Sequence, residues 1–398
     1  MTALAFAAIV SLALAHPHSV GRDYGTYPDF VHPANGDCTD YTIQTNVTFP
    51  SLTYAYPKWK DDHDVAAFLF NMSTKDAAKG SFQPYMDPPQ NVTRTYGVSA
   101  TFCSPKSKNG KEDNVIVATH GGGYDRRYWA SSFQPEKYNF VQAALGAGYS
   151  VFYYDRIGIG RSQRISGFDS QIAAQARVLN SLLQSVHAGT YTPKITAKKV
   201  VVVGHSIGSF ITNAAMAVAP ELADVAILTG MGYPSASDPA KGFSSYVFSF
   251  FGVRIAAQLP ADRAPQFAST YDTGYTAFGD MYRHIESFFH HPDYDYEAAE
   301  YAQSITAPNS ATELTSVAAV SLVAPGFKGK VLITSGNFDL LICNGNCTDT
   351  YAMGNQDIVF PGTKPDTYVH PGAGHGVNFG HNATGFYDHI LRYIDSSI

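Results

Sequence analysis

The pattern of hydrophobic and polar positions alternates between short apolar runs and longer segments with helical spacing. β-Branched and aromatic residues dominate the short runs, which predict strands at residues 96–103, 115–119, 150–154, 199–203, 225–229, 330–334 and 367–370. Apolar residues recur at helical spacing in residues 138–145, 170–187, 206–219 and 384–394. Such alternation is typical of an α/β class, so we expect a mostly parallel central sheet flanked by helices.

Two segments depart from this alternation. Residues 16–95 are rich in Pro, Tyr, Asn and Asp and predict an N-terminal extension packed on the core, with a short helix at residues 65–72. The extension could cover the mouth of an active site or only stabilise the core. Residues 232–329 are aromatic and helical in character and separate two core strands, so they predict a cap or lid. The α/β core then consists of residues 96–231 and 330–398.

The strongest candidate for chemistry follows a run of valines. Residues 200–203 are all valine, which predicts a strand buried on both faces, and they lead into Gly204-His205-Ser206-Ile207-Gly208. A strand, a sharp turn at a serine and a helix form a nucleophile elbow, where the flanking glycines leave room for a strained backbone. We therefore predict Ser206 as the nucleophile. A chance Gly/Ser turn is the alternative, because Gly-x-Ser-x-Gly alone is common.

A glycine loop follows the strand at residues 115–119. It reads His120-Gly121-Gly122-Gly123, and its bare backbone can present N–H groups to a developing oxyanion. We predict an oxyanion hole formed by the N–H groups of Gly122 and Ile207. A phosphate-binding loop is the competing interpretation, but the run lacks the Lys and Ser/Thr of a P-loop and the spacing of a dinucleotide fingerprint.

Further short motifs join these two in a fixed order along residues 115–376. The set is His120-Gly121-Gly122 with Trp129 downstream, Asp155-Arg156-x-Gly158-x-Gly160-x-Ser162, the serine elbow, Gly336-x-x-Asp339 and Gly374-His375-Gly376. On these motifs the chain resembles the α/β-hydrolase superfamily, in particular its serine esterase and lipase-like members. The resemblance implies an α/β-hydrolase fold with a helical cap, Ser-His-Asp chemistry, and a purely structural role for residues 155–162.

The resemblance assigns the acid of the triad to Asp339, which follows the first core strand after the cap. Chemistry requires such a group, because a carboxylate holds the base in the correct tautomer and stabilises the imidazolium that forms. Asp349 and Asp366 are the rivals, but neither directly follows a buried strand.

The predicted general base is His375, which lies in a glycine loop after the last strand. Ser, Asp and His then follow one another in the chain order of this fold. His370 and His381 are the fallback candidates. The chain has 14 histidines, so the assignment depends on loop context rather than on residue type.

Four cysteines, an even number, suit an oxidising compartment. Cys343 and Cys347 predict a small closed loop, which would stiffen the position of Asp339, and Cys38 and Cys103 would then pair. A metal site is the alternative, but no second close cysteine pair or ligand cluster accompanies this spacing. Three cap histidines lack partners placed by spacing, so we expect them to be ordinary cap residues: His284, His290 and His291.

The first residues predict export. Residues 1–15 hold no charged side chain, have an apolar centre and end in Ala-Leu-Ala, as expected of a secretory signal peptide. Their apolar run is shorter than the roughly 20 residues that a membrane span needs, and no other stretch qualifies. Five Asn-x-Ser/Thr sequons support a secreted, extracellular glycoprotein, namely Asn46, Asn71, Asn91, Asn346 and Asn382.

Net charge and the predicted chemistry narrow the kinds of molecule that the protein could bind. The net charge of −6, without basic clusters, argues against nucleic acid, and the predicted chemistry needs no cofactor and no metal. We expect a carboxylic ester or lactone, small or lipid-like, with apolar bulk that the cap aromatics at residues 243–251 and 271–289 could enclose. Acyl transfer, lyase or peptidase chemistry with the same triad is the alternative, as is a non-catalytic binding protein. Oligomeric state carries no prediction.

Overall fold

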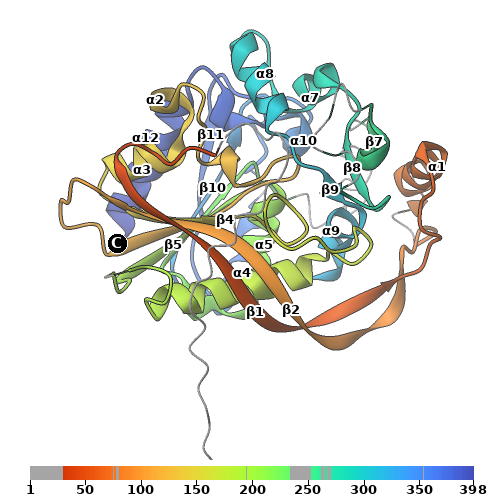
Figure 1. Ribbon diagram of the computed structural model, residues 1–398, viewed down its shortest axis with the longest axis horizontal. Coiled ribbons are helices and arrows are strands. Elements are labelled where there is room, and N and C mark those ends of the chain that lie inside the picture. Colours follow the sequence, from red (N-terminus) through yellow and green to blue (C-terminus); the bar gives the residue numbers. More distant parts are fainter. Residues whose placement is uncertain are drawn as a thin grey trace, which may run out of the picture.

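The computed structural model describes residues 30–74, 76–77, 80–193, 195–233, 252–260, 264, 267, 270–352 and 354–398. The predicted signal peptide and the cap aromatics at residues 243–251 lie outside these ranges. Within them, the backbone forms one large sheet with helices on both faces and a smaller group of elements above it (Figure 1).

The large sheet has eight strands in the order β1-β2-β4-β3-β5-β6-β10-β11. Their bounds are β1 Gly36–Tyr54, β2 Tyr85–Pro105, β3 Asn114–Thr119, β4 Ser150–Tyr154, β5 Lys199–His205, β6 Val225–Thr229, β10 Lys330–Gly336 and β11 Asp366–His370. From β4 to β11 all neighbours are parallel, whereas β2 pairs antiparallel with β4 and with β1. The predicted mostly parallel core is confirmed.

Helices cover both faces of this sheet, and the valines of β5 divide between them. Val200 and Val202 pack in the cluster that contains α4 (Ile172–His187) and α5 (Ile207–Val218). Val201 and Val203 pack in the opposite cluster, which contains α3 (Phe140–Gly146) and α12 (Ala383–Ser397). Since alternate side chains of a strand point to opposite faces, this explains why every position is apolar. The core also holds the short helices α2 (Pro135–Tyr138) and α11 (Asn355–Val359).

Much of the predicted N-terminal extension, residues 16–95, is part of the large sheet rather than a wrap around it. β1 pairs with β2 along a long ribbon that extends beyond the other strands to α1 (Asp62–Ser73), as Figure 1 shows. Buried and exposed residues alternate along residues 43–49, as they do in a strand with one face on the core. The helix expected at residues 65–72 is confirmed within α1. Cys38 and Cys103 face each other in the ribbon and form the predicted disulfide.

The cap is not purely helical, contrary to the prediction for residues 232–329. Its described part holds the helices α7 (Met281–Phe288), α8 (Tyr296–Ser304) and α9 (Ala311–Thr315). It also holds an antiparallel sheet of β7 (Val253–Ile255), β8 (Tyr275–Phe278) and β9 (Asn309–Ser310). The residues of β8 are all buried, and aromatic and β-branched residues favour a strand in such a place. None of the described helices is long and apolar enough to span a bilayer.

Candidate active site

Ser206 occupies the sharp turn between β5 and α5. Its backbone angles are φ 52° and ψ −119°, a conformation that side chains other than glycine rarely adopt. The flanking glycines are required for space: a Cβ on Gly204 would lie 2.6 Å from the Gly208 carbonyl oxygen, and one on Gly208 would lie 2.4 Å from that of Thr119. Ser206 is partly exposed between buried neighbours. The strained turn therefore presents the hydroxyl away from the sheet.

Asp339 lies three residues after the end of β10 and is fully buried. Its Oδ1 accepts hydrogen bonds from the backbone N–H groups of Leu341 (2.9 Å) and Ile342 (3.0 Å), at the start of α10 (Leu340–Cys343). Its Oδ2 accepts from the Ser335 hydroxyl and, at 2.7 Å, from Nδ1 of the fully buried His375. Four donors suit an ionised carboxylate, and the last of them fixes the proton of His375 on Nδ1.

The other ring nitrogen of His375 is thereby left as an acceptor. Nε2 is buried and has no hydrogen-bond partner among the described residues. The ring meets Phe288 of the cap edge to face, with 4.9 Å between centroids, and lies 4.9 Å from the ring of His205, the residue before Ser206. The structure thus brings Asp339 and His375 together beside the serine elbow.

His205 lies beside His375 without adding charge. Burial, with smaller effects from His375 and His120, holds the pKa of His205 well below its ordinary value. Its ring stacks on Tyr128 at 4.5 Å, and its Nδ1 lies 3.0 Å from the Thr229 hydroxyl. A neutral His205 leaves the developing charge of His375 to Asp339 alone.

A disulfide closes the loop that carries Asp339, as predicted. Cys343 and Cys347 are bonded, and the N–H groups of Cys343 (3.2 Å) and Gly345 (3.0 Å) donate to the Asp339 carbonyl. The N–H of Cys347 donates to the carbonyl of Asn337 at 3.0 Å. These bonds hold the backbone on both sides of the carboxylate.

The rival acids and bases make other contacts. Asp349 is exposed, and Asp366 begins β11 and accepts from the hydroxyl of Tyr393 at 3.0 Å. His370 is 3.0 Å from a backbone carbonyl at the start of α12, and His381 pairs with a surface aspartate at 2.9 Å. Among these candidates, only Asp339 and His375 bond to each other.

The glycine loop lies against the elbow. A Cβ on Gly121 would be 3.2 Å from the Ser206 Cβ, and one on Gly122 would be 3.8 Å from Cγ2 of Ile207. The predicted oxyanion donors, the N–H groups of Gly122 and Ile207, have no partner among the described residues. The neighbouring Gly123 N–H is already bound, at 2.8 Å, to Oδ1 of Asn309 in the cap.

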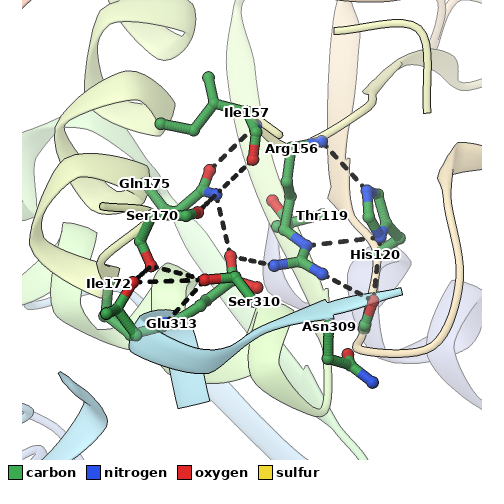
Figure 2. A network of polar contacts seen from close by, with 12 residues as sticks. Thr119, His120, Arg156, Ile157, Ser170, Ile172, Gln175, Asn309, Ser310 and Glu313 are labelled. Carbon is green, nitrogen blue, oxygen red and sulfur yellow. Dashed lines mark hydrogen bonds and ion pairs between the residues drawn. The ribbon is translucent and has the colours of Figure 1, made fainter. Parts of the chain in front are cut away.

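A buried polar network centred on Arg156 holds this loop in place (Figure 2). The Arg156 guanidinium forms an ion pair with Glu313 of α9 and donates to the Gly121 carbonyl at 3.1 Å. Its backbone N–H donates to Nε2 of His120 at 3.0 Å, and Gln175 donates to Glu313 at 2.9 Å. Burial, followed by the charge of Arg156, lowers the pKa of His120 to about 3.

The part played by the cap in this network could not be predicted from the sequence. Within residues 155–162, for which we predict a structural role, Asp155 accepts backbone hydrogen bonds from Arg126 (3.0 Å) and Arg161 (2.7 Å). Asn309 and Glu313 were not singled out, because no local motif marks them and their partners are distant in the chain.

The remaining cap predictions concern aromatic and histidine side chains. Phe278 and Phe288 lie near Gly123, where a Cβ would meet them at 3.1 and 3.7 Å. His284 is buried between Tyr124 (2.7 Å) and a glutamine, and another of the cap histidines, His290, pairs with an aspartate. Across the described ranges, no three potential metal ligands gather into a site.

The sequence model of the protein family described as "Alpha/beta hydrolase family" matches residues 115–388 of this chain. Norfluorocurarine synthase 1 from Strychnos is 27% identical over 143 residues, which are 36% of this chain and 47% of that protein. BpoC from Mycobacterium tuberculosis, named a non-heme bromoperoxidase, is 33% identical over 122 residues, 30% of this chain and 38% of its own. The chain therefore matches less than half the length of either relative.

Solved structures agree at the level of the fold. A carboxyl esterase from Bacillus coagulans superimposes with a TM-score of 0.50 at 16% identity, covering 76% of this chain and 94% of that one. The sheet order, the flanking helices and the family match together confirm the expected α/β-hydrolase fold.

Proposed function

Since the chain belongs to the alpha/beta hydrolase family, we propose that it is a serine hydrolase with Ser206 as nucleophile, His375 as general base and Asp339 as the acid. The observation that carries the proposal is the 2.7 Å hydrogen bond between the buried Asp339 and His375, beside a serine on a strained elbow. A structural histidine would not need a buried carboxylate on one nitrogen and an unpartnered second nitrogen.

In the proposed reaction, the hydroxyl of Ser206 attacks the substrate carbonyl while Nε2 of His375 takes its proton. The oxyanion is bound by the N–H groups of Gly122 and Ile207, and Asp339 stabilises the imidazolium. The protonated His375 then gives its proton to the leaving alcohol, which leaves an acyl group on the serine. Water, activated by the same histidine, releases the acid. No cofactor takes part in these steps.

The proposed substrate is a carboxylic ester or lactone with apolar bulk. Phe278 and Phe288 support this choice, since they lie over the glycine loop and the base and could exclude water from the acyl group. Relatives with this fold carry the names synthase, bromoperoxidase and esterase, so the fold alone does not select the reaction. Acyl transfer, lyase and peptidase activities remain the alternatives to test.

We also propose that the protein is secreted and glycosylated. All five sequon asparagines within the described residues are exposed, so that each could carry a glycan. The chain forms two disulfides, and disulfides persist in oxidising compartments. Expression in a eukaryotic secretory host should deliver protein to the medium, beginning after residue 15, with a mass that falls on deglycosylation.

A substrate panel tests the proposed reaction. The purified protein is incubated with p-nitrophenyl esters of increasing acyl length, aliphatic lactones, an amino-acid p-nitroanilide, and an ester together with an acceptor alcohol. Hydrolysis of esters or lactones that is lost in Ser206→Ala supports the proposal. Cleavage of the anilide alone, or transfer to the alcohol without hydrolysis, would favour the peptidase or acyltransferase alternative.

A further inference from the structure

One segment of the cap runs directly along the glycine loop. The N–H of Ala307 donates to the Gly123 carbonyl at 2.9 Å, and Thr306 forms an isolated antiparallel bridge with Tyr124. Asn309 accepts the Gly123 N–H at 2.8 Å through its Oδ1. The cap therefore binds both backbone polar groups of Gly123, although Asn309 and Gly123 lie 186 positions apart in the chain.

The Asn309 side chain also lies next to the predicted oxyanion donor. A Cβ on Gly122 would be only 2.5 Å from Asn309 Oδ1, so the amide oxygen packs directly against the Gly122 backbone. Asn309 is 4% exposed, which places this contact in the interior. Its position relative to the loop is thus set by packing as well as by the hydrogen bond.

A second contact orients the peptide between Gly121 and Gly122, which precedes the peptide bound by Asn309. The Gly121 carbonyl accepts from Arg156, and Arg156 is held by the ion pair with Glu313 of the cap. The Gly121 carbonyl and the Gly122 N–H belong to one planar trans peptide and point in opposite directions. Arg156 and, at 3.0 Å, Nδ1 of His120 together hold this carbonyl, so they also fix where the Gly122 N–H points. Asn309 does the same for the next peptide, through the N–H of Gly123.

We propose that the cap residues Asn309 and Glu313 are positioning residues for the oxyanion hole, a role that rests on the proposed serine hydrolase function. A run of three glycines has no side chains to restrict its backbone, so its order must come from outside the run. Asn309 supplies part of that order directly, through the Gly123 N–H, and Glu313 supplies part of it through Arg156. The cap is then required for the chemical step and not only for enclosing the substrate.

The proposal predicts a particular kinetic signature. Oxyanion donors act when charge develops in the transition state, so a misoriented Gly122 N–H lowers kcat more than it weakens ground-state binding. Removing one such donor typically costs about 10²- to 10³-fold in kcat. We expect Asn309→Ala, which acts through the loop, to lower kcat by about 10-fold or more, with KM changed by less than about threefold.

The matched control is Asn139→Ala. Asn139 is also buried, and its Oδ1 also accepts a backbone N–H at 2.8 Å, that of Gln142, but in the segment that begins α3. Asn309→Ala loses its buried bond to the Gly123 N–H, and Asn139→Ala loses two, because its Nδ2 also donates to the Ser131 carbonyl at 2.9 Å. Both variants should therefore lower the melting temperature, the control at least as much. Only Asn309→Ala should lower kcat and slow the labelling of Ser206 by a fluorophosphonate.

A second variant covers the case in which Asn309→Ala does not fold. Asn309→Leu keeps nearly the same side-chain shape but removes the acceptor oxygen, so the Gly123 N–H loses its partner without a large cavity. We expect a lower kcat with KM again little changed. If either folded variant at position 309 keeps kcat within about twofold of Asn139→Ala, the positioning role is refuted. If the wild type neither hydrolyses esters nor labels at Ser206, the proposed function fails and this inference falls with it.

Discussion

Asp339→Asn changes one atom at the centre of the proposed site, and its effect follows from the hydrogen bonds of the carboxylate. Oδ1 accepts two backbone N–H groups, so the oxygen of the new amide would take that side, because an NH₂ group there would face two donors. The NH₂ group would then face the Ser335 hydroxyl, which can turn to accept, and Nδ1 of His375. His375 must accept at Nδ1 and carry its proton on Nε2.

In that tautomer His375 cannot take the proton of Ser206. Loss of the correct tautomer in a serine triad lowers kcat by about 10⁴-fold, so we expect a fall of about 10³- to 10⁴-fold, or about 4–5 kcal/mol in the barrier. The assay is steady-state hydrolysis of a p-nitrophenyl ester, with a thermal melt to confirm that the variant is folded.

The rival acids provide the controls for this prediction. Asp366→Asn and Asp349→Asn should leave kcat within about twofold of the wild type, since neither side chain contacts His375. A folded Asp339→Asn enzyme that keeps more than about one tenth of the wild-type kcat would refute the reasoning. A large loss in one of the controls instead would move the role of the acid to that residue.

Three further variants, one of them followed as a function of pH, test the described contacts. Gly122→Ala should lower kcat by about 10²-fold, because its Cβ would lie 2.5 Å from Asn309 Oδ1, and activity equal to wild type would contradict this. Glu313→Gln should lower the free energy of unfolding in urea by about 3–5 kcal/mol, since it leaves a buried arginine uncompensated, and an unchanged value would contradict the buried ion pair. The pKa of His120 is about 3 in the folded state against 6.5 ordinarily, so the unfolded chain binds the proton more readily between these values. The stability that His120 contributes should therefore be complete above pH 6.5 and fall on acidification, by about 3 kcal/mol at pH 4.5 in urea unfolding, whereas His120→Gln should lack this component.

The core strands could be predicted because their burial is continuous. β5 is apolar at every position from Val200 to Val203, and the two hydrophobic clusters divide these side chains between the faces of the sheet. β1 was missed because it packs on the core through one face only. Exposed residues such as Asn46 and Thr48 alternate with Val47 and Phe49, which weakens the apolar signal.

In the candidate site, too, residues in local motifs could be predicted, whereas residues that act through contacts with distant segments could not. Ser206, Asp339 and His375 each lie in a short motif at the end of a strand, so the sequence alone could single them out. The role of Asn309 depends on the folded position of the cap, since its partner Gly123 is far away in the chain. Nothing in the neighbouring residues marks it, and only the fold reveals the contact.

The most direct test of the central claim is covalent labelling of the proposed nucleophile. The purified protein is treated with a fluorophosphonate, digested and analysed by mass spectrometry. The proposal predicts a single phosphonylated peptide with the modification on Ser206, and no labelling after Ser206→Ala or after heat denaturation. A folded wild-type protein that remains unlabelled, or one labelled at another serine, would contradict the assignment of Ser206 as the nucleophile.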